Sequence, residues 1–187
     1  MDLQSLALPT VNSTRSRTTQ FDARDGIFAY CSGQNVIVQT PSKLIVYADH
    51  KFRTTCVKIA PSGNYACSGD SAGFLNIFDL VGEDNVTILS QQVLSNVIYD
   101  LAWDHESQRI IVVGFGKDEF ARCFLVKSGA SIGSISGHSA PILSCDFRGK
   151  RPFRVVTGGE DGISNLYKGP PFNFPQSILP WILHQRC

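Results

Sequence analysis

The feature that most constrains the fold of this chain is an internal repeat of about 44 residues. Three large apolar residues, Ile59, Trp103 and Phe147, end short strand-like segments and lie 44 residues apart. About ten residues after each of them comes a turn built from small residues. These turns contain Gly69, Gly114 and Gly158, spaced by 45 and 44 residues. A period of this length is typical of proteins that repeat one small structural unit.

Within each repeat the pattern is strand, turn, strand. Residues 65–68 and 110–113 follow turn-forming segments, and residues 74–79 alternate as a third strand. Upstream, residues 32–35 are typical of a hairpin turn between two strands. We therefore expect an all-β fold, a partial β-propeller of about three and a half four-stranded antiparallel blades. The expected divisions are an N-terminal segment (1–20), the blades (21–174) and a non-repeat tail (175–187).

Particular residues indicate the type of blade. The Gly-His pair that ends at His138, and the small-residue turn that starts at Thr157, are similar to those of WD repeats. In such blades a His, a Ser or Thr, an Asp and a Trp form a buried hydrogen-bonded set. His138, Thr157 and Asp161 are the candidates for this structural network. Tyr167 replaces the Trp, and the first repeat has Ala72 where the Asp is expected. We therefore expect the blades to depend more on packing than on this network.

Composition narrows the class of function. The chain has 187 residues, a hydrophobic fraction of 43%, a charged fraction of 18% and a net charge of +1. This balance indicates a soluble globular protein and favours neither nucleic acid nor a membrane as partner. No basic leader precedes an apolar run, and no run approaches the length of a spanning helix. The six cysteines form no C-x-x-C pair, so we expect reduced thiols in the cytoplasm and no metal or cofactor.

Two short patterns have a catalytic and a structural interpretation. The Gly-x-Gly at 114–116 is similar to a dinucleotide loop, but no helical pattern follows it. His138, Ser144 and Asp161 could form a hydrolytic triad, but Ser144 lies in no nucleophile elbow. The WD-repeat pattern accounts for His138 and Asp161. We therefore expect a protein that is not an enzyme and has no catalytic residues.

Several longer segments go beyond a shared blade fold. They are residues 60–70, 100–103, 109–120, 128–138, 151–158 and the Gly-Pro-Pro-Phe run at 169–174. From about Leu6 to Phe174 the chain resembles the actin-interacting protein 1 family. The resemblance implies a member of a family with two seven-bladed propellers that promotes disassembly of cofilin-decorated actin filaments. The implied partners are actin filaments and cofilin, and the implied location is the cytoskeleton.

The resemblance also implies binding residues. The family's acidic loop residues correspond to Asp118 and Glu160, and a phenylalanine of its Pro-Pro-Phe-x-Phe motif corresponds to Phe174. The chain departs from the family at Phe115, where the family has an acid, and at Asn173, where it has a lysine. The alternatives are solvated turn chemistry for the two acids and core packing between blades for Phe174.

Alternative functions and states remain open at this point. The chain could be a generic WD-repeat scaffold for another complex. The resemblance stops after Phe174, so we expect a fragment or truncated isoform of the family's first propeller. Uncovered blade faces in such a chain could cause self-association.

Overall fold

Four antiparallel sheets of four strands make up the described part of the chain. The computed structural model describes residues 20–178, and only the backbone of Ser134 and of residues 173–178. In every sheet the strands are paired in chain order, which gives four successive meanders. The strands are β1 (Phe21–Arg24), β2 (Ile27–Ser32), β3 (Asn35–Gln39), β4 (Leu44–Tyr47), β5 (Thr54–Ile59), β6 (Tyr65–Asp70), β7 (Phe74–Asp79), β8 (Thr87–Gln92), β9 (Ile98–Trp103), β10 (Arg109–Gly114), β11 (Ala121–Leu125), β12 (Ser131–Ser134), β13 (Ile142–Phe147), β14 (Arg154–Gly159), β15 (Ser164–Lys168) and β16 (Asn173–Ile178).

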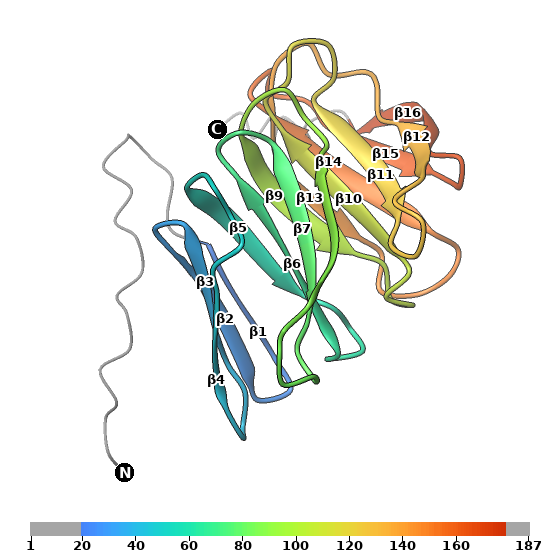
Figure 1. Cartoon of the computed structure of the whole chain (residues 1–187). Helices are drawn as coiled ribbons and strands as arrows, with labels where there is room; N and C mark the ends of the chain where they lie inside the picture. The colour runs from blue at the N-terminus through green and yellow to red at the C-terminus, as the bar shows by residue number, and fades with distance from the viewer. Residues whose placement is uncertain (1–19, 179–187) are drawn as a thin grey trace, which may run out of the picture.

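The four sheets stand side by side in an arc (Figure 1). The first strand of each sheet contacts the first strand of the next, so β1, β5, β9 and β13 form the inner side. The last strands, β4, β8, β12 and β16, form the outer side. Burial follows this order: β6 and β10 are buried on both faces for nearly their whole length, whereas β8 alternates between half-buried and exposed residues. A strand between two sheets must be apolar on both faces, and an outermost strand need not be.

Three apolar clusters hold the arc together, one between each pair of adjacent sheets. Each cluster takes large side chains from both sheets it joins. Representative members, one from each sheet, are Val38 and Phe78 in the first cluster, Leu75 and Phe124 in the second, and Ile111 and Tyr167 in the third. Burial of such side chains stabilises by roughly 1.5–3 kcal/mol each. The core of the described residues is therefore three successive layers, one between each two sheets, rather than one centre.

Side chains of the inner strands also reach the backbone of a neighbouring sheet. The Asp22 carboxylate accepts a hydrogen bond from the Ile59 N–H at 2.7 Å. The Asp100 carboxylate accepts one from the Cys145 N–H at 3.0 Å. The Trp103 indole donates to the carbonyl of Lys58 at 3.1 Å. These bonds fix how far one sheet can slide along the next.

The all-β fold of propeller blades predicted from the sequence is confirmed. The arc has four complete sheets where about three and a half blades were predicted, because the short outer strands carry too weak a pattern to be found in the sequence. The last of them, β16, pairs with β15 and ends at Ile178. It therefore crosses the proposed boundary at residue 175, and the remaining tail and most of the segment 1–20 lie outside the described residues.

Candidate partner-binding edge

One edge of the arc carries both kinds of loop that connect a sheet to its neighbour. In each meander the turn between the second and third strands ends at the same edge as the connector that enters the sheet. Backbone hydrogen bonds tie the turn to that connector: Ser71 N–H donates to the Arg53 carbonyl in the second sheet, and Glu160 N–H to the Pro141 carbonyl in the fourth, both at 2.9 Å. We call this the connector edge. It comprises residues 33–34, 48–53, 71–73, 93–97, 115–120, 135–141 and 160–163.

A buried histidine secures the connector edge of the fourth sheet. His138 Nδ1 lies 3.0 Å from the Asp161 carboxylate, and its Nε2 lies 2.8 Å from the Thr157 hydroxyl. The structure thus brings together the three residues assigned to a blade network. Asp161 also accepts hydrogen bonds from the backbone of Ser139 and Ile163. The carboxylate therefore fastens the connector to the turn of the same sheet.

The electrostatics of Asp161 reflect these contacts. Desolvation acts to raise the pKa of this carboxyl, but the backbone N–H groups of Ser139 and Ile163 and the contact with His138 outweigh it. The net result is a pKa lowered from its ordinary value. A carboxylate that accepts several hydrogen bonds is favoured in its charged form.

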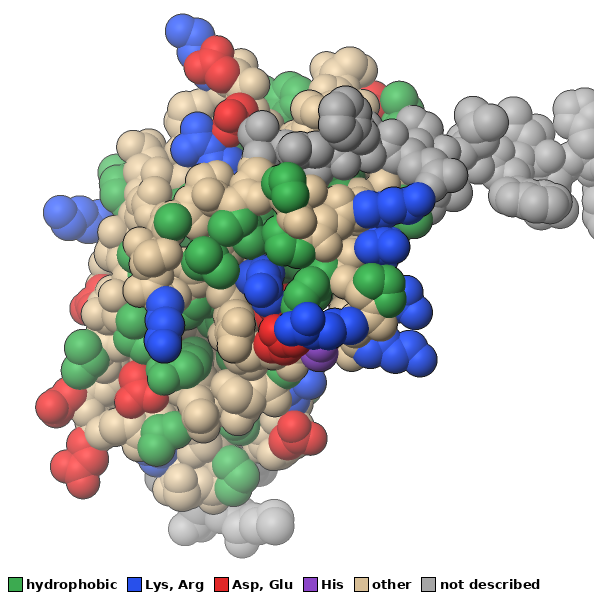
Figure 2. Space-filling view, turned by 90° about the vertical axis from the view of Figure 1, so that its right-hand side faces the viewer, with side chains coloured by type: hydrophobic (Ala, Val, Ile, Leu, Met, Phe, Trp, Pro, Cys, Tyr) green, Lys and Arg blue, Asp and Glu red, His purple; other side chains and the backbone are tan. Residues whose placement is uncertain are grey.

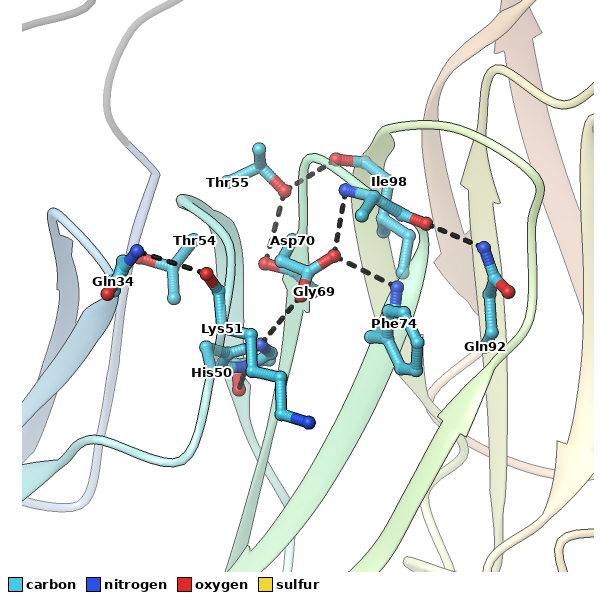
Figure 3. A network of polar contacts seen from close by, with 12 residues as sticks. Gln34, His50, Lys51, Thr54, Thr55, Gly69, Asp70, Phe74, Gln92 and Ile98 are labelled. Carbon is cyan, nitrogen blue, oxygen red and sulfur yellow. Dashed lines mark hydrogen bonds and ion pairs between the residues drawn. The ribbon is translucent and has the colours of Figure 1, made fainter.

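The second sheet contains a set that sequence analysis did not find. His50 Nδ1 lies 3.0 Å from Asp70 Oδ2, and its Nε2 lies 2.7 Å from the Ser68 hydroxyl. Figure 3 shows the His50–Asp70 contact within the surrounding network. The sequence predicts that this repeat has no acid for the network, because Ala72 stands at the acid's position. This prediction is wrong, because Asp70 at the end of β6 reaches the imidazole instead. The acid follows Ser68 by two residues here, whereas Asp161 follows Thr157 by four.

The third sheet has apolar residues at the corresponding positions. Leu94 lies 44 residues from both His50 and His138. Val112 pairs with Leu101 as Ser68 pairs with Val57 and Thr157 with Cys145, so it occupies the hydroxyl position. Leu94 and Val112 are both buried in the cluster between the second and third sheets. Packing replaces the network in the third sheet, as the sequence predicted, whereas the second and fourth sheets contain it.

Burial also argues against a catalytic role for the set at His138. The side chains of His138 and Asp161 are 1% and 5% exposed, and Thr157 is 2% exposed. A nucleophile and base must reach a substrate, and these groups are closed off from solvent. The His138 nitrogen that a triad would aim at Ser144 is paired with Thr157 instead.

Asp118 lies at the connector edge of the third sheet, in the loop between β10 and β11. Its side chain is exposed. Two glycines hold this loop close to the neighbouring backbone. A Cβ at Gly114 would lie 2.2 Å from the Val97 carbonyl oxygen, and one at Gly116 would lie 2.1 Å from that of Glu119. The loop is also tied down by Lys117 N–H, which donates to the Ser95 hydroxyl at 2.7 Å. The segment therefore presents Asp118 from a fixed position.

Glu160 lies at the corresponding turn of the fourth sheet, between β14 and β15, and is also exposed. The structure thus places Asp118 and Glu160 on successive sheets at the same edge. Phe174 is the second residue of β16, which begins at the opposite edge, and its side chain lies outside the described residues. Its neighbour Phe172 is fully buried and packs on Phe147, with ring centroids 5.7 Å apart.

Four of the five cysteines in residues 20–178 are buried. This part of the chain contains no group of three His, Cys, Asp or Glu side chains arranged to hold a metal ion. The five described cysteines are free, and burial raises the pKa of Cys31 to about 11. A thiol with a raised pKa is a poor nucleophile at neutral pH. In the same residues no helix has the length and apolarity to cross a bilayer.

Comparison with known proteins places the chain among WD-repeat proteins. Residues 129–168 match the family model described as WD domain, G-beta repeat. This match runs from the residues before β12 to the end of β15, so one sequence repeat supplies the outer strand of one sheet and three strands of the next. Because the sequence repeat is shifted by one strand relative to the sheet, each repeat links two adjacent sheets through the backbone.

Several curated proteins are similar along most of the chain. The "66 kDa stress protein" of Physarum polycephalum is 42% identical over 184 residues, covering 93% of this chain and 31% of that protein. WD repeat-containing protein 1 of Bos taurus is 37% identical over 175 residues, covering 92% and 29%. Actin-interacting protein 1 of Drosophila melanogaster is 38% identical over 156 residues, covering 82% and 26%. The chain spans about a third or less of the length of these relatives.

Proposed function

Because the chain belongs to the family of actin-interacting protein 1 and WD repeat-containing protein 1, we propose that it binds actin filaments and assists cofilin in their disassembly. The observation that carries the proposal is the 38% identity with a protein named for its interaction with actin, over 82% of this chain. The proposed action is binding in the cytoplasm at the cytoskeleton and involves no catalysed reaction.

The connector edge supports this proposal physically. Two exposed carboxylates, Asp118 and Glu160, project from turns that are fixed to their connectors by backbone hydrogen bonds. Fixed turns lose little conformational entropy when a partner binds, which favours affinity. We propose that these two acids contact the actin–cofilin surface. Phe174, at the other end of its sheet, is proposed as a separate contact.

Co-sedimentation with actin filaments, with and without cofilin, tests the proposal. We expect more of the chain to pellet with cofilin-decorated filaments than with bare ones. The double variant Asp118→Ala/Glu160→Ala should pellet several-fold less while it remains folded, because exposed turn residues change stability by about 0.5 kcal/mol or less. Circular dichroism of each variant checks the fold.

The matched control is Glu83→Ala/Asp84→Ala. These exposed acids lie in the loop between β7 and β8, at the edge opposite the connector edge. The control removes the same charge and should pellet like the original chain. Equal pelleting with bare and decorated filaments would exclude cofilin dependence. Equal losses in both double variants would mean that net charge, and not the connector edge, controls binding.

A further inference from the structure

A small pocket lies at the connector edge of the second sheet, away from Asp118 and Glu160. It has a volume of about 120 Å³ and opens between the connector 48–53 and the outer half of the sheet. The residues that line it come from the connector, the end of β6, and strands β7 and β8. They are Asp49, His50, Lys51, Phe52, Asp70, Phe74, Asn76 and Ser90.

Asn76, in the wall of this pocket, has a side-chain oxygen that accepts no hydrogen bond within residues 20–178. The residue is 2% exposed, and its Oδ1 has no hydrogen-bond partner among the described residues. Asn76 pairs with Ser68 on one side and Ser90 on the other, so its side chain lies in a polar row across the sheet. A buried carbonyl oxygen without a donor is costly, and a group that donates a hydrogen bond to it would bind favourably.

The neighbouring groups favour a donor with a positive charge. The nearby His50 cannot provide the donor, because both of its nitrogens are engaged by Asp70 and Ser68. Asp49 is exposed at the pocket and accepts a hydrogen bond from the Thr87 hydroxyl. Its carboxylate attracts cations. Lys51 is the opposing charge, but its side chain is exposed and can turn toward solvent.

Aromatic rings complete the pocket. The Phe52 and Phe74 rings are nearly parallel, at 17°, with centroids 6.3 Å apart. Phe52 is 46% exposed although it is large and apolar. Aromatic faces attract guanidinium and ammonium groups and pack against the methylene stems that carry them.

We propose that this pocket binds the cationic tip of one arginine or lysine side chain of a partner protein. The N–H group donates to Asn76 Oδ1, the positive charge faces Asp49, and the stem lies against Phe52 and Phe74. The proposal does not depend on the identity of that partner. It adds a second contact point on the edge proposed to meet actin and cofilin, and it can fail while the proposed function holds.

Saturation-transfer NMR on the full chain tests the pocket with three probes: the N-acetyl, N-methylamide derivatives of arginine, lysine and norleucine. This method observes the probe and works on assembled protein as well as on monomer. We expect transfer to the arginine or lysine probe, with a dissociation constant on the order of 1–10 mM for so small a ligand. We expect little transfer to norleucine, which has a similar stem without the charge. The stronger of the two cationic signals identifies the residue that the pocket prefers.

Two variants assign that signal to the pocket. Asp49→Asn changes an exposed side chain, so the chain should fold, and it should weaken binding of the cationic probe by about two- to fivefold. Asn76→Leu should abolish binding. Glu83→Gln, on the opposite edge, is the control for Asp49→Asn and should leave the signal unchanged. Asn165→Leu changes a buried asparagine of the fourth sheet that does not line this pocket, and it controls for Asn76→Leu.

Three results would overturn the proposal. The first is equal transfer to norleucine, which would indicate apolar adhesion. The second is binding that Asp49→Asn leaves unchanged. The third is no transfer to either cationic probe, in which case the pocket serves only to hold water at Asn76.

Discussion

Single buried imidazoles hold the connector edge in place. His50 and His138 each bridge a hydroxyl on the sheet to a carboxylate in the turn, and each carboxylate in turn accepts backbone N–H groups. The sequence predicted the set at His138 because its spacing matches the WD-repeat pattern. It missed Asp70 because the two hairpins have the same length, yet in the second sheet the acid that reaches the imidazole lies two residues earlier along the chain. The spacing of residues along the chain does not show which carboxylate contacts the histidine.

The lowered pKa of Asp161 makes a prediction about acid stability. A carboxyl whose folded pKa lies below its unfolded value of about 3.8 stabilises the protein above that pH. This contribution is lost as the pH falls through the folded pKa, so the affected window lies below about pH 4. Urea unfolding at pH 5, 4 and 3 should show a steeper loss of stability for the original chain than for Asp161→Asn.

Asp84→Asn, in an exposed loop, controls for the loss of one negative charge. Parallel pH profiles for the original chain and Asp161→Asn would mean that Asp161 does not contribute to acid unfolding.

At the scale of elements, the turns of the connector edge pack closely against neighbouring backbone, and this packing determines which side chains the edge exposes. The loop 115–120 is held by two glycines whose missing Cβ atoms leave room for neighbouring carbonyl groups. The sequence predicted the repeat and most of the inner and central strands. It was wrong about the turns at Gly69, Gly114 and Gly158, because these glycines belong to the last residues of β6, β10 and β14 and the turns follow them. It did not reveal the outer strands or the pocket at Asn76, because a short half-exposed strand has a weak pattern and a pocket depends on contacts between separate elements.

Replacement of one loop glycine should show how far filament binding depends on the conformation of the loop rather than on its charged side chains. In Gly116→Ala the new Cβ would lie 2.1 Å from the Glu119 carbonyl, so the loop must shift. We expect a loss of about 1–3 kcal/mol in the free energy of unfolding and weaker filament binding, although no charge has changed. Denaturant unfolding and co-sedimentation measure the two effects.

Gly149→Ala is the matched control. Its Cβ would meet nothing within 4 Å, so stability should change by about 0.5 kcal/mol or less. If Gly116→Ala behaved like this control, the loop would have to accommodate a methyl group without moving Asp118.

At the scale of the whole molecule, the two outer sheets of the arc turn apolar side chains outward. On the first sheet Phe21 and Val46, at the two ends of one row across the strands, are 64% and 55% exposed, whereas Tyr30 and Ile37 between them are buried at 4% and 3%. On the fourth sheet Val156 is 38% exposed. Figure 2 shows hydrophobic side chains scattered over one face of the molecule, with Lys and Arg side chains gathered at one margin.

We predict that this 20.5 kDa chain associates with itself through these faces. Exposed apolar patches of more than a few hundred Å² are uncommon on soluble monomers. Size-exclusion chromatography with light scattering should give a mass above that of one chain, and Val46→Glu should lower it. Val81→Glu, which adds the same charge at an exposed valine in the loop after β7, is the control. A monodisperse monomer at the highest soluble concentration would contradict the prediction.

The strictly sequential pairing of the strands has a consequence for how the chain is made. Every hydrogen-bonded strand pair joins neighbours in the sequence, so no sheet has to wait for a distant segment before it closes. Contacts that are local in sequence form quickly, and domains generally fold as they leave the ribosome. Each sheet can therefore fold while the next is being translated, and its exposed apolar face becomes the template on which that next sheet condenses. Synthesis and assembly then proceed in the same direction, from β1 to β16.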